Sequence, residues 1–118
     1  MIIAAGDQMF DLLNKDIFLL DSIIERFDIY QLNHCLVVDI YFRLMHGKEK
    51  SLMLRFGNVR EYQFYYNSKG NFYNVDFFKL LKNKSLFYLS LDPDESKPEM
   101  LSSDQDIVLS ETLEGYTY

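Results

Sequence analysis

The chain has 118 residues, a formal net charge of −6 and an aromatic content of 16%, supplied by ten Phe and nine Tyr with no Trp. The length suits one domain over residues 1-118, and the Phe and Tyr content favours strands. The single cysteine excludes an intrachain disulfide, no apolar run is long enough to span a membrane, and the first residues lack a signal-peptide pattern, so we expect a soluble cytoplasmic protein.

The first predicted element is a short helix over Asp7 to Phe18. Met9, Leu12 and Leu13 lie at helical spacing, and Asp7 is placed to cap the first turn. The period then changes, because residues 21–30 alternate between a mainly apolar and a mixed set. Such alternation predicts a half-buried strand.

Two further strands are predicted on either side of a polar loop. Cys35 to Met45 is rich in β-branched and aromatic residues, and Ser51 to Phe56 resumes the pattern after the glycine-containing run from His46 to Lys50. Two strand-like runs around a five-residue loop predict an antiparallel hairpin.

Gly57-Asn58 is expected to end that strand, with another strand from Val59 to Tyr66 and a turn at Asn67 to Gly70. Asn74 or Asp76 could then cap a helix of about two turns, with lysines near its end where cations suit the helix dipole. That helix would carry on one side Phe77, Leu80 and Leu81.

The last third of the chain reads as short strands and turns. Ser85 to Leu91 predicts a compact strand, and Asp92-Pro93-Asp94 predicts a turn. Two more short strands are expected near residues 107–110 and 113–118. Short connections favour antiparallel neighbours, so the expected fold is α+β and β-dominated: an antiparallel curved sheet or small sandwich with one or two short helices.

No catalytic or metal-binding constellation is recognisable. His34 and Cys35 are adjacent on a predicted strand, where neighbouring side chains point to opposite faces, and His46 falls in a predicted turn. We therefore expect a strand-edge role for His34, a buried structural thiol at Cys35, and neither enzymatic activity nor a metal or cofactor. The chain also lacks a phosphate-binding glycine loop and a glycine-flanked serine nucleophile.

Charge is segregated along the chain. Residues 92–118 carry eight carboxylates against Lys97 alone, whereas residues 43–84 carry nine basic side chains against three acidic ones. Basic residues interleaved with aromatic ones are typical of single-strand nucleic-acid grooves. The net charge, the pI of about 4.8 and the lack of an RNP-like motif argue against a nucleic-acid partner, and these basic residues can instead pair with the acidic ends of the chain.

The acidic carboxy-terminal stretch has two interpretations. It is either a solvated surface that keeps the protein soluble, or a docking surface for a basic protein, steered by charge and anchored by an exposed aromatic side chain. The residues that would form such a surface are Asp92, Asp94, Glu95, Asp104, Asp106, Glu111, Glu114 and Tyr116.

Three segments carry a resemblance to a known group of proteins. They are the strand Leu52 to Val59, which closes on a Phe-x-Asn-Val turn, the strand Leu86 to Leu91, and Ser102 to Val108 leading to Glu114-Gly115-Tyr116. This order resembles small β-rich bacterial proteins, including immunity proteins of polymorphic toxin systems. The resemblance implies a non-enzymatic inhibitor that occludes a toxin's active site, and an acidic surface suits that role because many such toxins are basic nucleases.

The sequence thus predicts a non-enzymatic protein-binding domain, with an immunity-type inhibitor of a basic partner as its most specific form. The alternative is a small-molecule-binding or structural module. Such a module could form a homodimer through an exposed aromatic sheet face carrying Tyr62, Phe64 and Tyr66.

Overall fold

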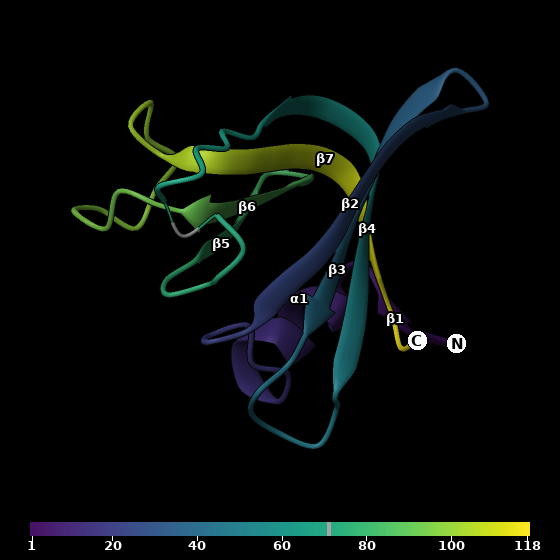
Figure 1. Ribbon diagram of the computed structural model, residues 1–118. Coiled ribbons are helices and arrows are strands. Elements are labelled where there is room, and N and C mark those ends of the chain that lie inside the picture. Colours follow the sequence, from purple (N-terminus) through teal and green to yellow (C-terminus); the bar gives the residue numbers. More distant parts are fainter. Residues whose placement is uncertain (71) are drawn as a thin grey trace.

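The computed structural model describes residues 1–70 and 72–118, which form one antiparallel sheet and one helix (Figure 1). The elements in chain order are β1 (Ile2–Ala5), α1 (Asp7–Lys15), β2 (Ile23–Leu32), β3 (Cys35–Arg43), β4 (Ser51–Gln63), β5 (Lys79–Asn83), β6 (Leu86–Asp92) and β7 (Gln105–Tyr116). The strand order is β2-β3-β4-β7-β6-β5, and β1 pairs with the far end of β7. The expected β-dominated α+β class is confirmed.

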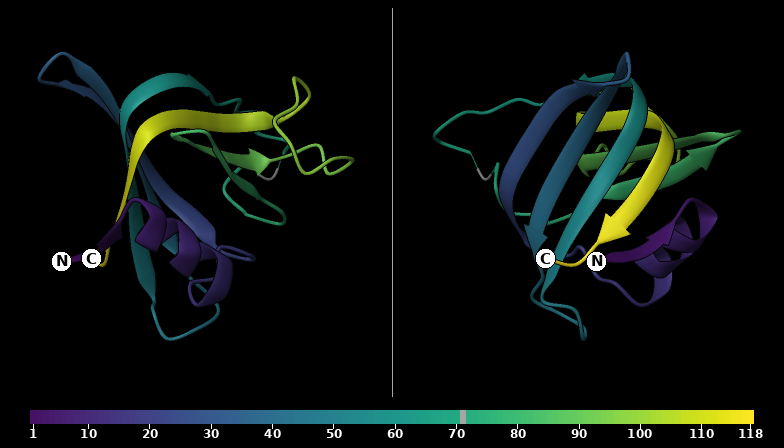
Figure 2. Two further views of the ribbon diagram at one scale, coloured as in Figure 1. Left: turned by 180° about the vertical axis from the view of Figure 1, so that it is seen from behind. Right: turned by 90° about the vertical axis from the view of Figure 1, so that its right-hand side faces the viewer.

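The sheet folds back on itself because its two central strands, β4 and β7, are long and bent (Figure 1). The first half of β4 pairs with the last half of β7, and its second half, after a register shift between Val59 and Glu61, pairs with the first half of β7. Asn58, just before the shift, has a left-handed φ of 47°. Such an irregularity increases strand bending, so β2 and β3 lie on one side of the fold while β5 and β6 lie on the other (Figure 2).

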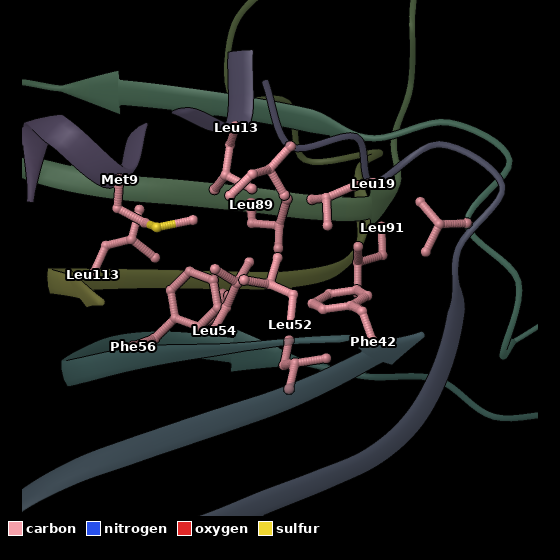
Figure 3. Close-up of a cluster of buried hydrophobic side chains, with 14 of the residues drawn as sticks. Met9, Leu13, Leu19, Phe42, Leu52, Leu54, Phe56, Leu89, Leu91 and Leu113 are labelled. Atoms are coloured by element: carbon pink, nitrogen blue, oxygen red, sulfur yellow. The ribbon is translucent and has the colours of Figure 1, made fainter. Parts of the chain in front are cut away.

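The core fills the space inside the bend. Helix α1 contributes its buried Met9 and Leu13 to a cluster that also contains buried residues of β3, β4, β6 and β7 (Figure 3). Helix α1 therefore covers the inner side of the folded sheet. The largest fully buried side chains are Phe42, Phe56, Met9, Leu19, Ile40, Leu52, Leu54, Leu89 and Leu113.

Several local expectations are confirmed, with shifted ends. The amino-terminal helix, the β3–β4 hairpin, the turn at Asn67 and the strand at β6 all form. Asp7, however, does not cap the helix with its side chain: Gly6 occupies the N-cap position, and Asp7 instead pairs with Lys82. No helix among the described residues is long and apolar enough to cross a membrane.

The predicted second helix is wrong. Residues 79–83 form β5, which pairs with β6 through a tight turn in which Lys84 takes a left-handed φ of 59°. Leu80 and Leu81 therefore point to opposite faces of the sheet instead of sharing a helix side. Pairing with β6 outweighs a weak local helix pattern here, as tertiary contacts commonly do.

The predicted strand breaks are also wrong. Gly57-Asn58 does not end a strand but lies within β4, and the two predicted short strands at the carboxy terminus are one continuous strand, β7. The pairing of the amino-terminal β1 with β7 was not predicted. His34 does not lie on a strand edge, because it occupies the β2–β3 turn with a φ of 66°.

Gly115 marks the closest approach between the sheet and the helix. A Cβ atom built at Gly115 would lie 2.2 Å from Met9 Sδ, and Met9 is fully buried. The methionine cannot retreat without disturbing the core, so only glycine fits at this position of β7.

We expect Gly115→Ala to lower the free energy of unfolding by about 1–3 kcal/mol, because the added methyl group overpacks the core. Chemical denaturation monitored by circular dichroism measures this change. Gly70→Ala is the matched control, since its Cβ would meet nothing closer than the Asn67 carbonyl oxygen at 3.6 Å. Equal stability of the two variants would show that Met9 does not constrain Gly115.

Candidate functional site

A cavity of about 320 Å³ opens between the segment that connects β4 to β5 and the loop that connects β6 to β7. These two segments lie at the same end of the molecule, away from the termini (Figures 1 and 2). We call this cavity the carboxylate pocket. Its described lining residues are Tyr65, Asn67, Gly70, Phe72, Asn74, Asp76, Phe77, Leu91, Asp92, Pro93, Glu95, Gln105 and Asp106.

The charge of the carboxylate pocket is entirely negative. Four carboxylates line it, from Asp76, Asp92, Glu95 and Asp106, and no lysine or arginine is among its described lining residues. None of the four takes part in an ion pair within the part of the chain that the structure describes. Carboxylates gathered in a concave site focus a negative potential that attracts cations.

Asp106 is the half-buried member of these four carboxylates. Burial raises the pKa of Asp106, and the nearby Asp92 carboxylate raises it further, although the backbone N–H of Tyr65 donates a 2.7 Å hydrogen bond that lowers it. A raised carboxyl pKa means that the ionised form of Asp106 is disfavoured. A bound cation would stabilise that ionised form.

Aromatic rings form the pocket's walls. Tyr65 is 65% exposed and Phe77 is 56% exposed, whereas Phe72 is held by neighbouring rings at centroid distances of 5.2–5.6 Å. Aromatic faces beside carboxylates suit guanidinium and ammonium groups, which gain both ion pairing and cation–π attraction. The ring neighbours of Phe72 are Phe27, Tyr66 and Tyr73.

One buried carboxylate organises the β6–β7 wall of the pocket. Asp104 is 5% exposed, and its two oxygens accept hydrogen bonds from Lys79 Nζ at 2.8 Å, from Tyr88 Oη at 2.6 Å and from the backbone N–H groups of Asp94 and Leu101. Lys79 Nζ also donates to the Glu99 carbonyl oxygen at 2.9 Å. These bonds tie both ends of the loop to β5 and β6, and so position the residues at the pocket.

The pKa values of this cluster reflect its bonding. Burial by itself would raise the pKa of Asp104, but the hydrogen bonds from Lys79, Tyr88 and the two backbone N–H groups outweigh it and lower the pKa. Burial and the bond to Asp104 raise the pKa of Tyr88. The Asp104 carboxylate is therefore stabilised in its ionised form by the folded chain.

The structure divides the predicted partner-binding residues into three groups. Asp92, Glu95 and Asp106 line the carboxylate pocket. Asp104 is buried, and Asp94 accepts hydrogen bonds from the Ser96 backbone N–H and the Ser103 hydroxyl, which hold its pKa at about 2. These two shape the loop itself.

The remaining three predicted residues lie further along β7. Glu111 accepts hydrogen bonds from Arg60 and from Asn58, whose amide lies 2.6 Å away. Glu114 accepts the Tyr116 hydroxyl at 3.1 Å, and the Arg55 guanidinium lies 5.1 Å from the centre of the Tyr116 ring. Glu111, Glu114 and Tyr116 therefore contact neighbouring side chains on the sheet, and none of the three lines the pocket.

The sequence interpretation missed Asp76 and the aromatic walls. The sequence pattern places Asp76 at a possible helix cap and Phe77 on the side of that helix, while Tyr65 and Phe72 fall among the aromatic residues of the basic segment. The sequence signal that could have pointed to them is a run of aromatic residues with an acid in the long connection before β5. A second acidic connection follows β6. Register alone does not reveal that these two loops meet.

The basic residues of the middle segment pair with acids, as the sequence suggested. Five of them form ion pairs that reach carboxylates elsewhere in the chain: Arg43 with Glu25, Arg55 with Asp39, Arg60 with Glu111, Lys79 with Asp104 and Lys82 with Asp7. Charges held in this way are less available to bind a phosphate backbone.

The histidines and the cysteine show no common site. His46 Nε2 lies 2.8 Å from Asp21 Oδ2 at the surface, and His34 is exposed in the β2–β3 turn beside the half-buried Cys35. Among the described residues, no group of three or more His, Cys, Asp or Glu side chains has the geometry to hold a metal ion.

Comparison of the chain with protein-family models, with curated proteins and with solved structures found no match. The function must therefore be argued from the chemistry of the carboxylate pocket.

We expect Asp104→Asn to lower the free energy of unfolding by about 3 kcal/mol, because it leaves the buried Lys79 ammonium without its counter-charge. Glu99→Gln is the matched control in the same loop, since only the Glu99 backbone carbonyl accepts from Lys79. Urea denaturation near neutral pH compares the two. Equal loss in both variants would contradict the organising role of the Asp104 carboxylate.

The same variant should show a characteristic pH dependence. Because folding lowers the Asp104 pKa, its contribution to stability is present above the ordinary value of 3.8 and is lost as the pH falls through the folded-state pKa. The deficit of Asp104→Asn relative to wild type should therefore shrink as the pH is lowered below about 4. A deficit that stays constant down to the acid unfolding of the protein would contradict this prediction.

Proposed function

We propose that this protein is a non-enzymatic protein-binding domain whose carboxylate pocket receives a basic side chain of its partner. The observation that carries the proposal is the pocket itself: four carboxylates that no cation opposes among the described residues, beside the rings of Tyr65, Phe72 and Phe77. A lysine or arginine of a partner would supply the missing charge and stack on those rings.

The surroundings of the pocket favour a protein partner. Tyr62, Tyr65, Tyr66 and Tyr73 are all exposed on or next to the β4–β5 connection. Exposed tyrosines around a concave anchor site are common at protein interfaces, where a few desolvated side chains supply most of the affinity. The acidic field would speed the approach of a basic protein, while the aromatic contacts would slow its release.

The immunity-type function belongs to this proposal as its most specific form. The resemblance of the strand pattern to bacterial immunity proteins implies a toxin as the partner, and many such toxins are basic. Inhibition would be stoichiometric, with the domain covering the toxin's active site and performing no chemistry.

The second candidate is a small-molecule-binding module. A cavity of about 320 Å³ lies at the lower end of the range for small-ligand sites. In that case the occupant would be a small organic cation held by the same carboxylates and rings. The two candidates differ in the surface that the ligand contacts. A protein partner would contact the exposed tyrosines around the pocket, whereas a small cation would contact only the pocket itself.

The proposal can be tested with a tetra-arginine peptide as the probe and isothermal titration calorimetry at low salt. Neutralising three pocket carboxylates, in the triple variant Asp76→Asn, Asp92→Asn and Glu95→Gln, should weaken binding by about tenfold, equivalent to about 1.4 kcal/mol. Added salt should weaken wild-type binding because the attraction is electrostatic.

The matched control neutralises three acids away from the pocket, on or directly after helix α1 and in the β3–β4 connection, in the variant Asp11→Asn, Asp16→Asn and Glu49→Gln. It changes the net charge by the same amount and should bind within about twofold of wild type. If both variants bound the peptide equally weakly, affinity would depend only on net charge, and the pocket proposal would be contradicted. Binding of methylguanidinium as tight as that of the peptide would instead support the small-molecule candidate.

A further inference from the structure

The second site lies at the edge of the sheet formed by β2, whose Phe27 ring packs 5.3 Å from the Phe72 ring of the pocket wall. The strand order ends in β2 on one side and β5 on the other. On its outer edge β2 is met only near its start, where Ile23 bridges to Asn74 and the Ile24 N–H donates to the Tyr73 carbonyl oxygen at 2.7 Å. From Glu25 to Leu32 no described residue pairs with that edge. We call this stretch the free edge.

The free edge belongs to a projecting hairpin. β3 pairs with β4 only from Val38 onward, so the tip of the β2–β3 hairpin extends beyond the rest of the sheet (Figure 1). Two large apolar side chains are exposed there, Ile29 at 42% and Leu32 at 56%. An exposed strand edge with apolar side chains is a template for pairing with another strand.

The two sheet edges are protected differently. β5 has only five residues, and it carries Lys82 and is followed by Lys84, which is the usual protection of an edge strand. β2 has ten residues, and its protection, the bulge between Ile24 and Arg26 and the charges of Glu25, Arg26 and Asp28, lies before its apolar tip. From Ile29 to Leu32 the free edge carries none of these devices.

The hairpin geometry specifies which backbone groups are available. Asn33 and His34 form a two-residue turn with φ values of 52° and 66°, and Leu32 pairs with Cys35 beside it. In such a turn the closing pair exchanges hydrogen bonds, and the bonded pairs then alternate along the ladder. The N–H and C=O groups of Phe27, Ile29 and Gln31 consequently point to the free edge. The outward bond of Ile24, beyond the one-residue bulge, fits this alternation.

We propose that the free edge pairs with the same edge of a second copy of this chain, in antiparallel register about a two-fold axis at Ile29. Ile29 would then face Ile29 of the other copy, and Phe27 would face its Gln31. This register uses residues 26–32 and stops short of the part of β2 that residues 73–75 already cover. A register centred on Phe27 would place the second strand against that covered part.

The side chains also suit this register. Asp28 would lie opposite Tyr30 of the second copy, and Arg26 opposite its Leu32, so no like charges oppose each other. The exposed Ile29 side chains meet at the axis. Such a two-fold contact is self-complementary and closed, as homodimer interfaces require. The dimer would present two carboxylate pockets, which could engage a partner bivalently.

Sedimentation velocity over a concentration series tests the proposal, since wild type should move from the 14.1 kDa chain mass towards twice that value. Ile29→Pro should abolish the shift, because it removes an N–H that points outward and leaves the β2–β3 ladder intact. If the proline variant does not fold, Ile29→Lys should also abolish the mass shift, because it would place two lysines opposite each other at the axis. Met45→Lys, at an exposed apolar residue away from the free edge, should dimerise like wild type.

Amide hydrogen exchange tests the register. The amides of Phe27, Ile29 and Gln31 should gain protection of about tenfold or more as concentration rises, whereas those of Asp28, Tyr30 and Leu32 should be protected at every concentration. A protein that stays monomeric throughout the series would overturn the proposal. A dimer that survives both substitutions at Ile29, or protection without this alternation, would overturn it as well.

Discussion

The buried ion pair between Asp104 and Lys79 is the interaction on which the candidate site depends. It joins β5 to the loop before β7, and together with Tyr88 and two backbone N–H groups it saturates the carboxylate with hydrogen bonds. A buried ion pair is a weak source of net stability, but it strongly disfavours arrangements in which either charge is left alone. The loop that bears Asp92 and Glu95 is therefore held in one conformation.

Charge in this protein is balanced in space and not along the chain. Five basic side chains of the middle segment form ion pairs with carboxylates of other segments. These carboxylates include Glu25 and Asp39 before the segment and Asp104 and Glu111 after it. Four of the acids that form no ion pair among the described residues lie together where the two long loops meet, in the carboxylate pocket. Part of the net charge of −6 is therefore gathered at one concave site, where it attracts cations.

Local patterns in the sequence were sufficient for the elements that local chemistry determines. The alternation in β2, the β-branched and aromatic content of β3 and the polar loop at His46 predicted strands and a hairpin that the structure contains. Features set by distant partners were not predictable: β5 follows from pairing with β6, and the bend in β4 follows from the register shift in its pairing with β7. The same limit applies to the site. The sequence does not distinguish Asp104, which is buried, from an exposed acid, because its partner Lys79 lies 25 residues away in the chain.

The most direct test of the pocket is a map of where a cationic ligand binds. A tetra-arginine peptide titrated into the ¹⁵N-labelled protein, followed by amide chemical shifts, reports every affected backbone position. We predict that the shifts will cluster in residues 65–70, 72–77 and 91–106, which include the described residues that line the pocket. Shifts spread evenly over the acidic surface, or centred on Glu111 and Glu114, would contradict the account.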